Sequence, residues 1–224
     1  SLSVNGSLIS QGTISISGVA QFFTDGNIYA EKIELKGSGN FESKGGIIEV
    51  EGEWKITGGS SIKVSRTEVI LDDKFNRTGG PSIEFIGGSL TVGDDFIGSG
   101  GGSICFDGTE VEVENDTKLS GSVVVNIGGR GFFSTNKAEL KGASAIRGKD
   151  MGGWFNCSEI QFSGSAQVKC VDGGCLYDRN NADEMPRELD LGANASTVLP
   201  VELLYFEALV EADGMLVINW ATAI

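Results

Sequence analysis

The chain has 224 residues, enough for one elongated domain or for one domain and part of a second. Its formal net charge is −14, so nucleic acid and anionic membrane surfaces are poor partners, because both bind clusters of basic side chains. No His is present, which removes the commonest general base and metal ligand and leaves an enzyme only carboxylates, Lys, Arg or Tyr.

Residues 1–170 consist of short units that resemble one another, such as SLSVNGSLISQG, TISISGVAQFFTDG and SIKVSRTEVILDD. Each unit alternates apolar and polar residues over one strand length and then turns, most often at Gly. Glycine is abundant (34 residues) and proline is rare (3), which favours many tight corners between short strands. The period of two places one apolar set on the inner side of these strands: Leu2, Val4, Ile14, Ile16, Ile33, Leu35, Ile48, Val50, Ile62, Val64, Ile83, Phe85, Leu90, Val92, Ile104, Phe106, Val111, Val113, Val123, Val125, Ile160 and Phe162.

Short strands at this spacing are compatible with a sandwich, a barrel or a solenoid. The similarity of the units and the scarcity of hairpin dipeptides within them favour the solenoid. We therefore expect an all-β fold whose main part is a parallel β-helix (β-solenoid), right-handed by precedent, with coils of about 20 residues stacked at about 4.8 Å.

Three segments follow from this pattern. The solenoid is expected over residues 1–170, and an irregular cap and linker over 171–199, where the repeat is lost. Residues 200–224 alternate again over two strand lengths around Asp213-Gly214, which predicts a β-hairpin.

The last segment resembles a known family. LPVELLYFEA followed by LVINWATA is similar to the segment that opens the C-terminal region of surface proteins exported by the type IX secretion system of bacteroidete bacteria, and SLSVNGSLISQGTISIS is similar to their repeats. The resemblance implies that the hairpin begins an immunoglobulin-like domain, and that the protein is secreted or displayed at the cell surface. The rest of that domain and a sorting signal do not follow in the sequence, so the chain is expected to be a fragment of a longer protein.

Four cysteines are present: Cys105, Cys157, Cys170 and Cys175. Their spacing does not match a zinc site, and the two Gly between Cys170 and Cys175 make this pair the first disulfide candidate. Cys105 is expected to be a buried thiol. No metal or cofactor is expected; calcium is conceivable for so acidic a chain, but neither an EF-hand loop nor a Gly-Gly-x-Gly-x-Asp repeat supports it.

Residues 93–104, GDDFIGSGGGSI, carry two adjacent carboxylates. The segment is similar to the Gly-Asp-Asp segment of polygalacturonases, which are β-helix hydrolases, and this similarity would make Asp94 and Asp95 an acid pair. The Asn-Thr-Asp and Gly-His-Gly segments of that family are missing. The segment also aligns with SLSVNGSLISQG, in which case Asp95 merely occupies a corner of the repeat.

Aromatic side chains offer a second kind of site. Trp54, Trp154, Tyr29, Phe132 and Phe133 could stack on sugar rings, although core packing is the commoner role of aromatic residues. The segment GGWFNC, residues 152–157, is the best candidate. Trp154 and Phe155 are therefore expected as carbohydrate contacts.

These patterns predict a non-enzymatic, secreted or cell-surface protein with a structural or adhesive role. Its partners would be another copy or a neighbouring subunit, joined by added strands, or a polysaccharide. The alternative is a carbohydrate-binding or carbohydrate-cleaving β-helix protein, which a groove of carboxylates and aromatics along one face would favour. No apolar run is long enough to span a membrane, so membrane insertion is not expected.

Overall fold

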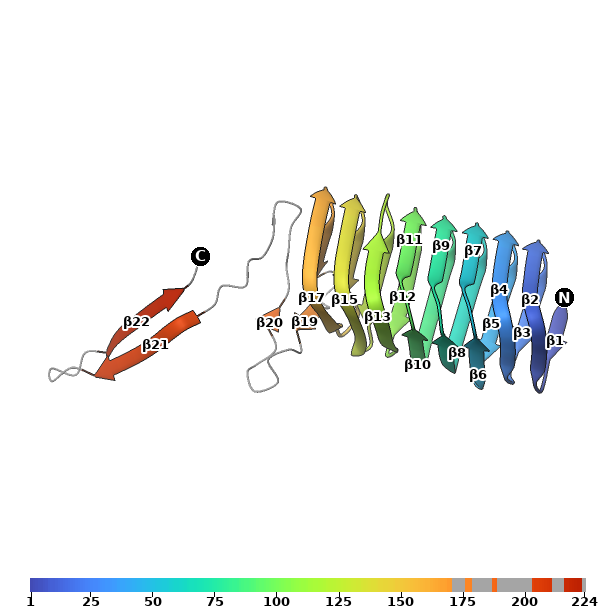
Figure 1. Cartoon of the computed structure of the whole chain (residues 1–224), viewed down its shortest axis with the longest axis horizontal. Helices are drawn as coiled ribbons and strands as arrows, with labels where there is room; N and C mark the ends of the chain where they lie inside the picture. The colour runs from blue at the N-terminus through green and yellow to red at the C-terminus, as the bar shows by residue number, and fades with distance from the viewer. Residues whose placement is uncertain (171–175, 179–186, 189–202, 211–215, 223–224) are drawn as a thin grey trace.

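The computed structural model describes residues 1–170, 176–178, 187–188, 203–210 and 216–222, and within these ranges it contains strands and no helix. Figure 1 shows the strands stacked as successive coils along one axis, from β1 (Leu2–Val4) at one end to β17 (Gly153–Gly164) at the other. Each coil pairs in parallel with the coils before and after it. The predicted parallel β-solenoid is confirmed.

Every coil contributes strands to three ladders, which we call the first, second and third faces in chain order. The first face contains β1, β3 (Gln21–Thr24), β5 (Asn40–Lys44), the start of β8 (Ser61–Leu71), the start of β10 (Ser82–Val92), β12 (Ser103–Asp107), β14 (Val124–Gly128), β16 (Ala145–Gly148) and β18 (Gln167–Cys170). The second face contains the start of β2 (Leu8–Gly18), the start of β4 (Ile28–Gly37), β6 (Ile47–Val50), the ends of β8 and β10, the starts of β13 (Glu110–Leu119), β15 (Gly131–Gly142) and β17, and β19 (Leu176–Asp178). The third face contains the ends of β2 and β4, β7 (Trp54–Gly58), β9 (Phe75–Gly79), β11 (Phe96–Gly100), and the ends of β13, β15 and β17.

The coil length is close to the predicted value and varies along the stack. In the middle, Ile83 lies between Ile62 and Ile104, which are equally far from it in the sequence. The step from Ile14 to its partner Ile33 is shorter than this, and the step from Phe133 to its partner Phe155 is longer. The coils are therefore shortest near β2 and longest near β17.

The predicted inner set forms one continuous core. Of its members only Leu2, in the first strand, is largely exposed (53 %), because the described chain places no coil beyond it. Between these aliphatic side chains runs a column of aromatic rings, in which Phe22 stacks on Phe41 at 5.2 Å and Phe75 stacks on Phe96 at 4.8 Å. Since each coil contacts only its neighbours, burial grows with every coil that is added.

A row of glycines turns the chain at the end of the third face. Gly37, Gly58, Gly79, Gly100, Gly121, Gly142 and Gly164 all have positive φ, and a Cβ added to any of them would lie within 3.1 Å of the carbonyl oxygen of the glycine one coil earlier. Only glycine combines this conformation with this close approach. The glycine corners expected from the sequence are therefore steric requirements of the coil stack.

One cation occupies an inner position of the core. Arg77 is fully buried between Ile56 and Gly98 of the neighbouring coils, and its Nη2 donates to the carbonyl oxygens of Pro81 and Gly101. Within the described part of the chain, its Nε and Nη1 have no hydrogen-bond partner. Burial lowers the pKa of the Arg77 guanidinium to about 10.

The solenoid continues past its predicted end at residue 170. β19 adds a rung to the second face, with Leu176 beside Gly153, and β20 (Arg187–Glu188) pairs antiparallel with β19. Most of the predicted cap and linker, residues 171–199, lies outside the described residues. The predicted C-terminal hairpin is present as β21 (Leu203–Val210) and β22 (Leu216–Thr222), which pair antiparallel.

Candidate functional site

The outer side of the third face carries charges of both signs that pair with one another. Lys32 reaches Glu34 at 3.0 Å and Glu53 at 3.2 Å, and Lys36 reaches Glu34 at 2.6 Å. The Lys36 and Lys32 amines hold the pKa of the Glu34 carboxyl below its ordinary value. The same pattern recurs in later coils, where Glu139 lies between Lys137 and Lys141. These ion pairs link neighbouring coils and neighbouring positions of one coil.

Asp94 and Asp95 belong to this network. Asp94 accepts a hydrogen bond of 2.7 Å from the Asn115 side chain and pairs with Lys74 at 3.2 Å, and these contacts hold its pKa below the ordinary value. Asp95 pairs with Lys118 at 2.7 Å. A general acid needs the opposite, a carboxyl whose pKa is raised. This arrangement favours the alternative in which the two residues occupy a corner of the repeat.

The second face differs sharply in charge from the third. Its outer side, together with the bend that follows it, carries a row of exposed carboxylates: Glu31, Glu49, Glu51, Glu68, Asp72, Glu110, Glu112 and Glu114. Within the described ranges, none of these eight forms an ion pair. The row therefore presents uncompensated negative charge along one side of the rod.

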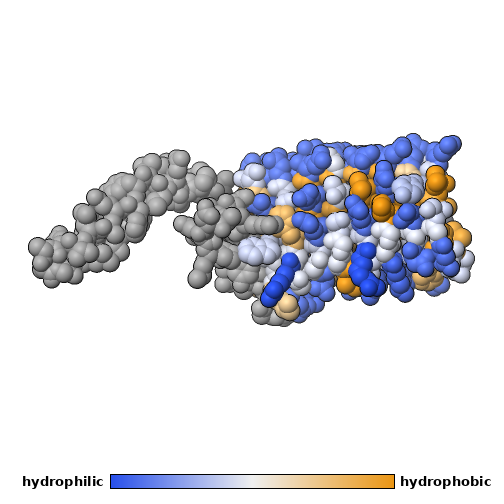
Figure 2. All heavy atoms as spheres, turned by 90° about the horizontal axis from the view of Figure 1, so that it is seen from below, coloured by the Kyte–Doolittle hydropathy of each residue, from blue (hydrophilic) through white to orange (hydrophobic). Residues whose placement is uncertain are grey.

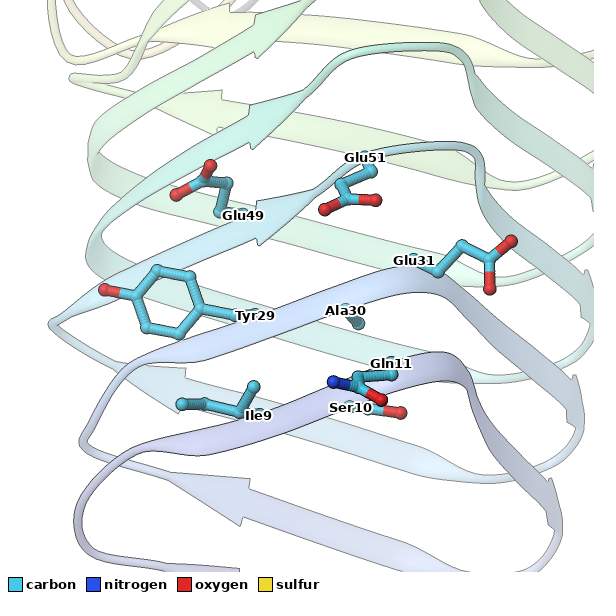
Figure 3. A pocket seen from close by; sticks show the side chains of 8 residues that line it. All are labelled: Ile9, Ser10, Gln11, Tyr29, Ala30, Glu31, Glu49 and Glu51. Atoms are coloured by element: carbon cyan, nitrogen blue, oxygen red, sulfur yellow. The ribbon is translucent and has the colours of Figure 1, made fainter.

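A hollow of about 270 Å³ lies within this acidic row on the first three coils (Figure 3). Ile9, Tyr29 and Glu49 form one column of side chains across it, and Gln11, Glu31 and Glu51 form a second. In the described part of the chain, no three His, Cys, Asp or Glu side chains lie close enough together to hold a metal ion. The hollow is therefore acidic, but its described side chains do not form a cluster that could coordinate a metal ion.

The second face becomes aromatic in its last coils. One outer column reads Glu110, Phe132 and Trp154 in register on β13, β15 and β17, and β19 places Tyr177 at the next position. We call Phe132 and Trp154 the aromatic pair; both are half-buried. Because neighbouring parallel strands lie about 4.8 Å apart, the two side chains emerge one strand spacing from each other.

Two hollows adjoin the aromatic pair. The larger, about 390 Å³, is lined by the pair together with Thr109, Glu110 and Arg130. The smaller, about 240 Å³, lies beside Trp154 and is lined by Arg130 and Met151. In the view of Figure 2, the hydrophobic side chains lie as separate patches between hydrophilic ones along the described coils.

The backbone beside the aromatic pair departs from the regular repeat. In two successive bends between the first and second faces, first Arg130 and then Asp150 and Met151 have positive φ, which residues other than glycine seldom adopt. Arg66, in an earlier bend of the same row, is the other described non-glycine residue with positive φ. A Cβ added to Gly129, which also has positive φ, would lie 2.8 Å from the backbone nitrogen of Gly108, so this bend also depends on glycine. The longer coils begin at the same place.

The structure separates the predicted carbohydrate contacts. Trp154 lies on the outer side as expected, but Phe155 is 2 % exposed and packs against Phe133 in the core. Adjacent residues of a strand point to opposite sides, so only one of the two could face a ligand. Trp54 and Phe133 are likewise core residues, whereas Tyr29 and Phe132 lie outside.

The cysteines are only partly described. Cys105 is half-buried on the outer side of the first face, rather than buried as expected, because Ile104 and Phe106 take the inner positions. Cys175 lies outside the described residues, so the Cys170–Cys175 disulfide stays a prediction.

Sequence reasoning missed Arg130 and Glu110 as neighbours of the aromatic pair. Glu110 lies two coils before Trp154, and only the register of the coils brings them into one column. The one local signal was the change from TEV at residues 109–111 to GFF at residues 131–133, which replaces a carboxylate by an aromatic residue at the same place in the repeat.

Comparison with family models, curated proteins and solved structures gives no match for this chain. No helix in the described residues has the length and apolar character needed to cross a membrane.

Proposed function

We propose that the chain is a non-enzymatic structural or adhesive protein, exported to the cell surface, whose solenoid acts as a stiff spacer and presents its outer faces to other molecules. The observation that carries this proposal is the unbroken stack of coils, in which three hydrogen-bonded ladders surround one core. Bending such a stack would break ladder hydrogen bonds or open the core on one side, so its shape is maintained along its whole length.

Two further features support this role. The glycine row at the end of the third face fixes the spacing of the coils through backbone contact, and the ion pairs of that face, such as Lys32 with Glu53, link one coil to the next. The net charge of −14 favours solubility outside the cell. The resemblance of LPVELLYFEA and LVINWATA to exported surface proteins supports the proposed location.

Location at the cell surface is tested by labelling with antibodies raised against this chain. The proposal predicts that the antibodies label intact cells of the source organism, or detect the protein in the culture medium. Labelling that requires broken cells would contradict it. The accompanying proposal that copies associate by strand addition is tested separately, by light scattering at increasing protein concentration; a constant monomer mass would contradict that part alone.

A further inference from the structure

The aromatic pair combines the two chemistries that a sugar ring requires. A pyranose has an apolar face of C–H groups, which packs on aromatic rings, and a rim of hydroxyls, which needs hydrogen-bonding groups at the edge of the contact. Phe132 and Trp154 provide adjacent rings on successive strands. Glu110 and Arg130, both exposed, stand at the edge of the same 390 Å³ hollow as acceptor and donor.

The surrounding backbone is also specialised at this place. Arg130 and Met151 have φ values of 62° and 67°, and Asp150 has 40°, which means that three residues other than glycine hold a left-handed conformation in two successive bends. Such conformations cost free energy and cluster at binding sites. In the earlier bends of the same row the positive φ values fall on Gly45 and Gly46, on Arg66, on Gly87 and Gly88, and on Gly108. Among the described residues, two successive non-glycine residues with positive φ therefore occur only at Asp150 and Met151.

The site also fits a chain of sugars better than a single small molecule. It is extended, since one hollow of about 390 Å³ and another of about 240 Å³ both border Trp154. The outer column of the second face runs along the rod axis, across the strands, and β19 continues its register beyond Trp154. A linear polysaccharide could lie along this column with successive rings over successive strands.

We propose that Phe132, Trp154, Arg130 and Glu110 form a binding site for pyranose units of a polysaccharide. The inference rests on the proposed adhesive function and specifies the class of molecule that the rod holds. It involves no chemical step. The site would bind its ligand on the second face near the last coils, far from the acidic hollow of the first three coils.

The test is affinity electrophoresis of the full chain through gels that contain laminarin, xylan, polygalacturonic acid or soluble glycol chitin. At least one of them is expected to retard the wild-type protein. Phe132→Ala and Trp154→Ala should each weaken this binding about tenfold or more, as loss of a stacking ring does. Arg130→Asn should weaken it about threefold or more, and Asn tolerates the positive φ of this position, so the fold is retained.

The matched control is Phe23→Ala. Phe23 is also a half-buried outward Phe beside a hollow, on the first face, but its partners in register are Ser3 and Glu42 rather than aromatic residues. The bend that follows it holds no left-handed residue of the kind found at Arg130. This variant should bind as the wild type does. Far-UV circular dichroism verifies that each variant is folded. If either aromatic variant is unfolded, the Arg130→Asn result decides whether this site binds the polysaccharide.

Retardation by none of the polysaccharides, or equal retardation of the wild type and the Phe132 and Arg130 variants, would overturn the proposal. If residues after Cys170 occupy the hollow instead, no polysaccharide binds, and Trp154→Ala lowers the melting temperature more than Phe23→Ala does. Surface labelling of intact cells is unaffected by any of these outcomes, so failure of the sugar site is distinguishable from failure of the proposed function.

Discussion

Gly100 lies directly against Gly79 at the end of the third face, and a Cβ added to Gly100 would come within 2.5 Å of the Gly79 carbonyl oxygen. Both residues have positive φ (92° and 96°). The contact joins two coils through their backbones alone, so no side chain can be inserted at this bend without separating the strands. The glycine row thus determines how closely the coils stack.

Gly100→Ala should destabilise the protein by about 2–4 kcal/mol, because the new methyl group adds a steric clash to the cost of a left-handed conformation for alanine. Chemical denaturation measures this loss. Gly80→Ala is the matched control, since Gly80 follows Gly79 in the equivalent bend one coil earlier and has nothing within 4 Å of its would-be Cβ. Equal loss in both variants would show that the bend is not tightly packed.

The inner aromatic column should dominate the stability of the middle coils. Phe96 is fully buried and stacks on Phe75 with an interplanar angle of 8°. Phe96→Ala is expected to cost about 3–5 kcal/mol through lost burial and the cavity left behind. Phe23→Ala, an outward position, should cost much less, and thermal unfolding of both variants compares them. A small effect at Phe96 would mean that the core is loosely packed.

Arg77→Met should raise the free energy of unfolding by about 1–3 kcal/mol, because Met fills similar volume without burying a guanidinium whose hydrogen bonds are incomplete. Arg77→Ala should destabilise the protein, since it leaves a cavity. The two variants thus separate the charge from the volume. If Arg77→Met also destabilises, the bonds from Nη2 to Pro81 and Gly101 outweigh the cost of burial.

The increase in the free energy of unfolding expected for Arg77→Met should depend on pH, because the pKa of Arg77 is lowered. Because burial lowers the pKa of Arg77 to about 10, the folded state should release this proton at a lower pH than the unfolded state does. The penalty of the buried charge is therefore complete below pH 10 and decreases above it, so wild-type stability gains relative to Arg77→Met as the pH rises past 10. Denaturation of both proteins at about pH 8 and about pH 11 measures the difference, which should shrink.

Neutralising a carboxylate should have opposite effects on two faces. Glu34→Gln removes a charge that lies between Lys32 and Lys36 and should cost about 0.5 kcal/mol at neutral pH. Glu49→Gln removes one charge from the unpaired acidic row and should be neutral or slightly stabilising. Because the folded pKa of Glu34 is below its ordinary value of 4.5, its contribution is present above that pH and is lost as the pH falls through the folded pKa. Denaturation at about pH 7 and about pH 3 tests both statements.

The alternation of apolar residues was sufficient to predict the fold and most of the core. Pairs such as Ile33 and Leu35 or Ile62 and Val64 are buried as expected, because a period of two leaves little choice of side. The pattern could not place Arg77 in the core, since a cation at an inner position breaks the rule on which the prediction depends. It also placed the end of the ladders at residue 170, where the polar segment begins, although β19 continues the second face.

The candidate site was predictable only in part. Trp154 was correctly expected at the surface, but its neighbour Phe155 was assigned with it, although adjacent strand residues cannot share a side. Glu110 and Phe132 belong to the site because they lie in register with Trp154, and the coils between them are slightly longer than the middle coils. Such a small change in coil length leaves no trace in the alternation, so only the paired strands reveal the column.

The register of the coils is tested most directly by a disulfide across one rung. On the outer side of the first face Glu84 lies beside Cys105, and adjacent parallel strands bring Cα atoms to about 4.8 Å, within the range that a disulfide spans. Glu84→Cys should therefore oxidise to a disulfide with Cys105, identified by peptide mass spectrometry. Lys63→Cys, two strands from Cys105, should not form this bond. A disulfide between Cys105 and the new cysteine of Lys63→Cys would contradict the coil stack on which the proposed spacer and its sugar site depend. Failure of both variants to form a disulfide with Cys105 would contradict it as well.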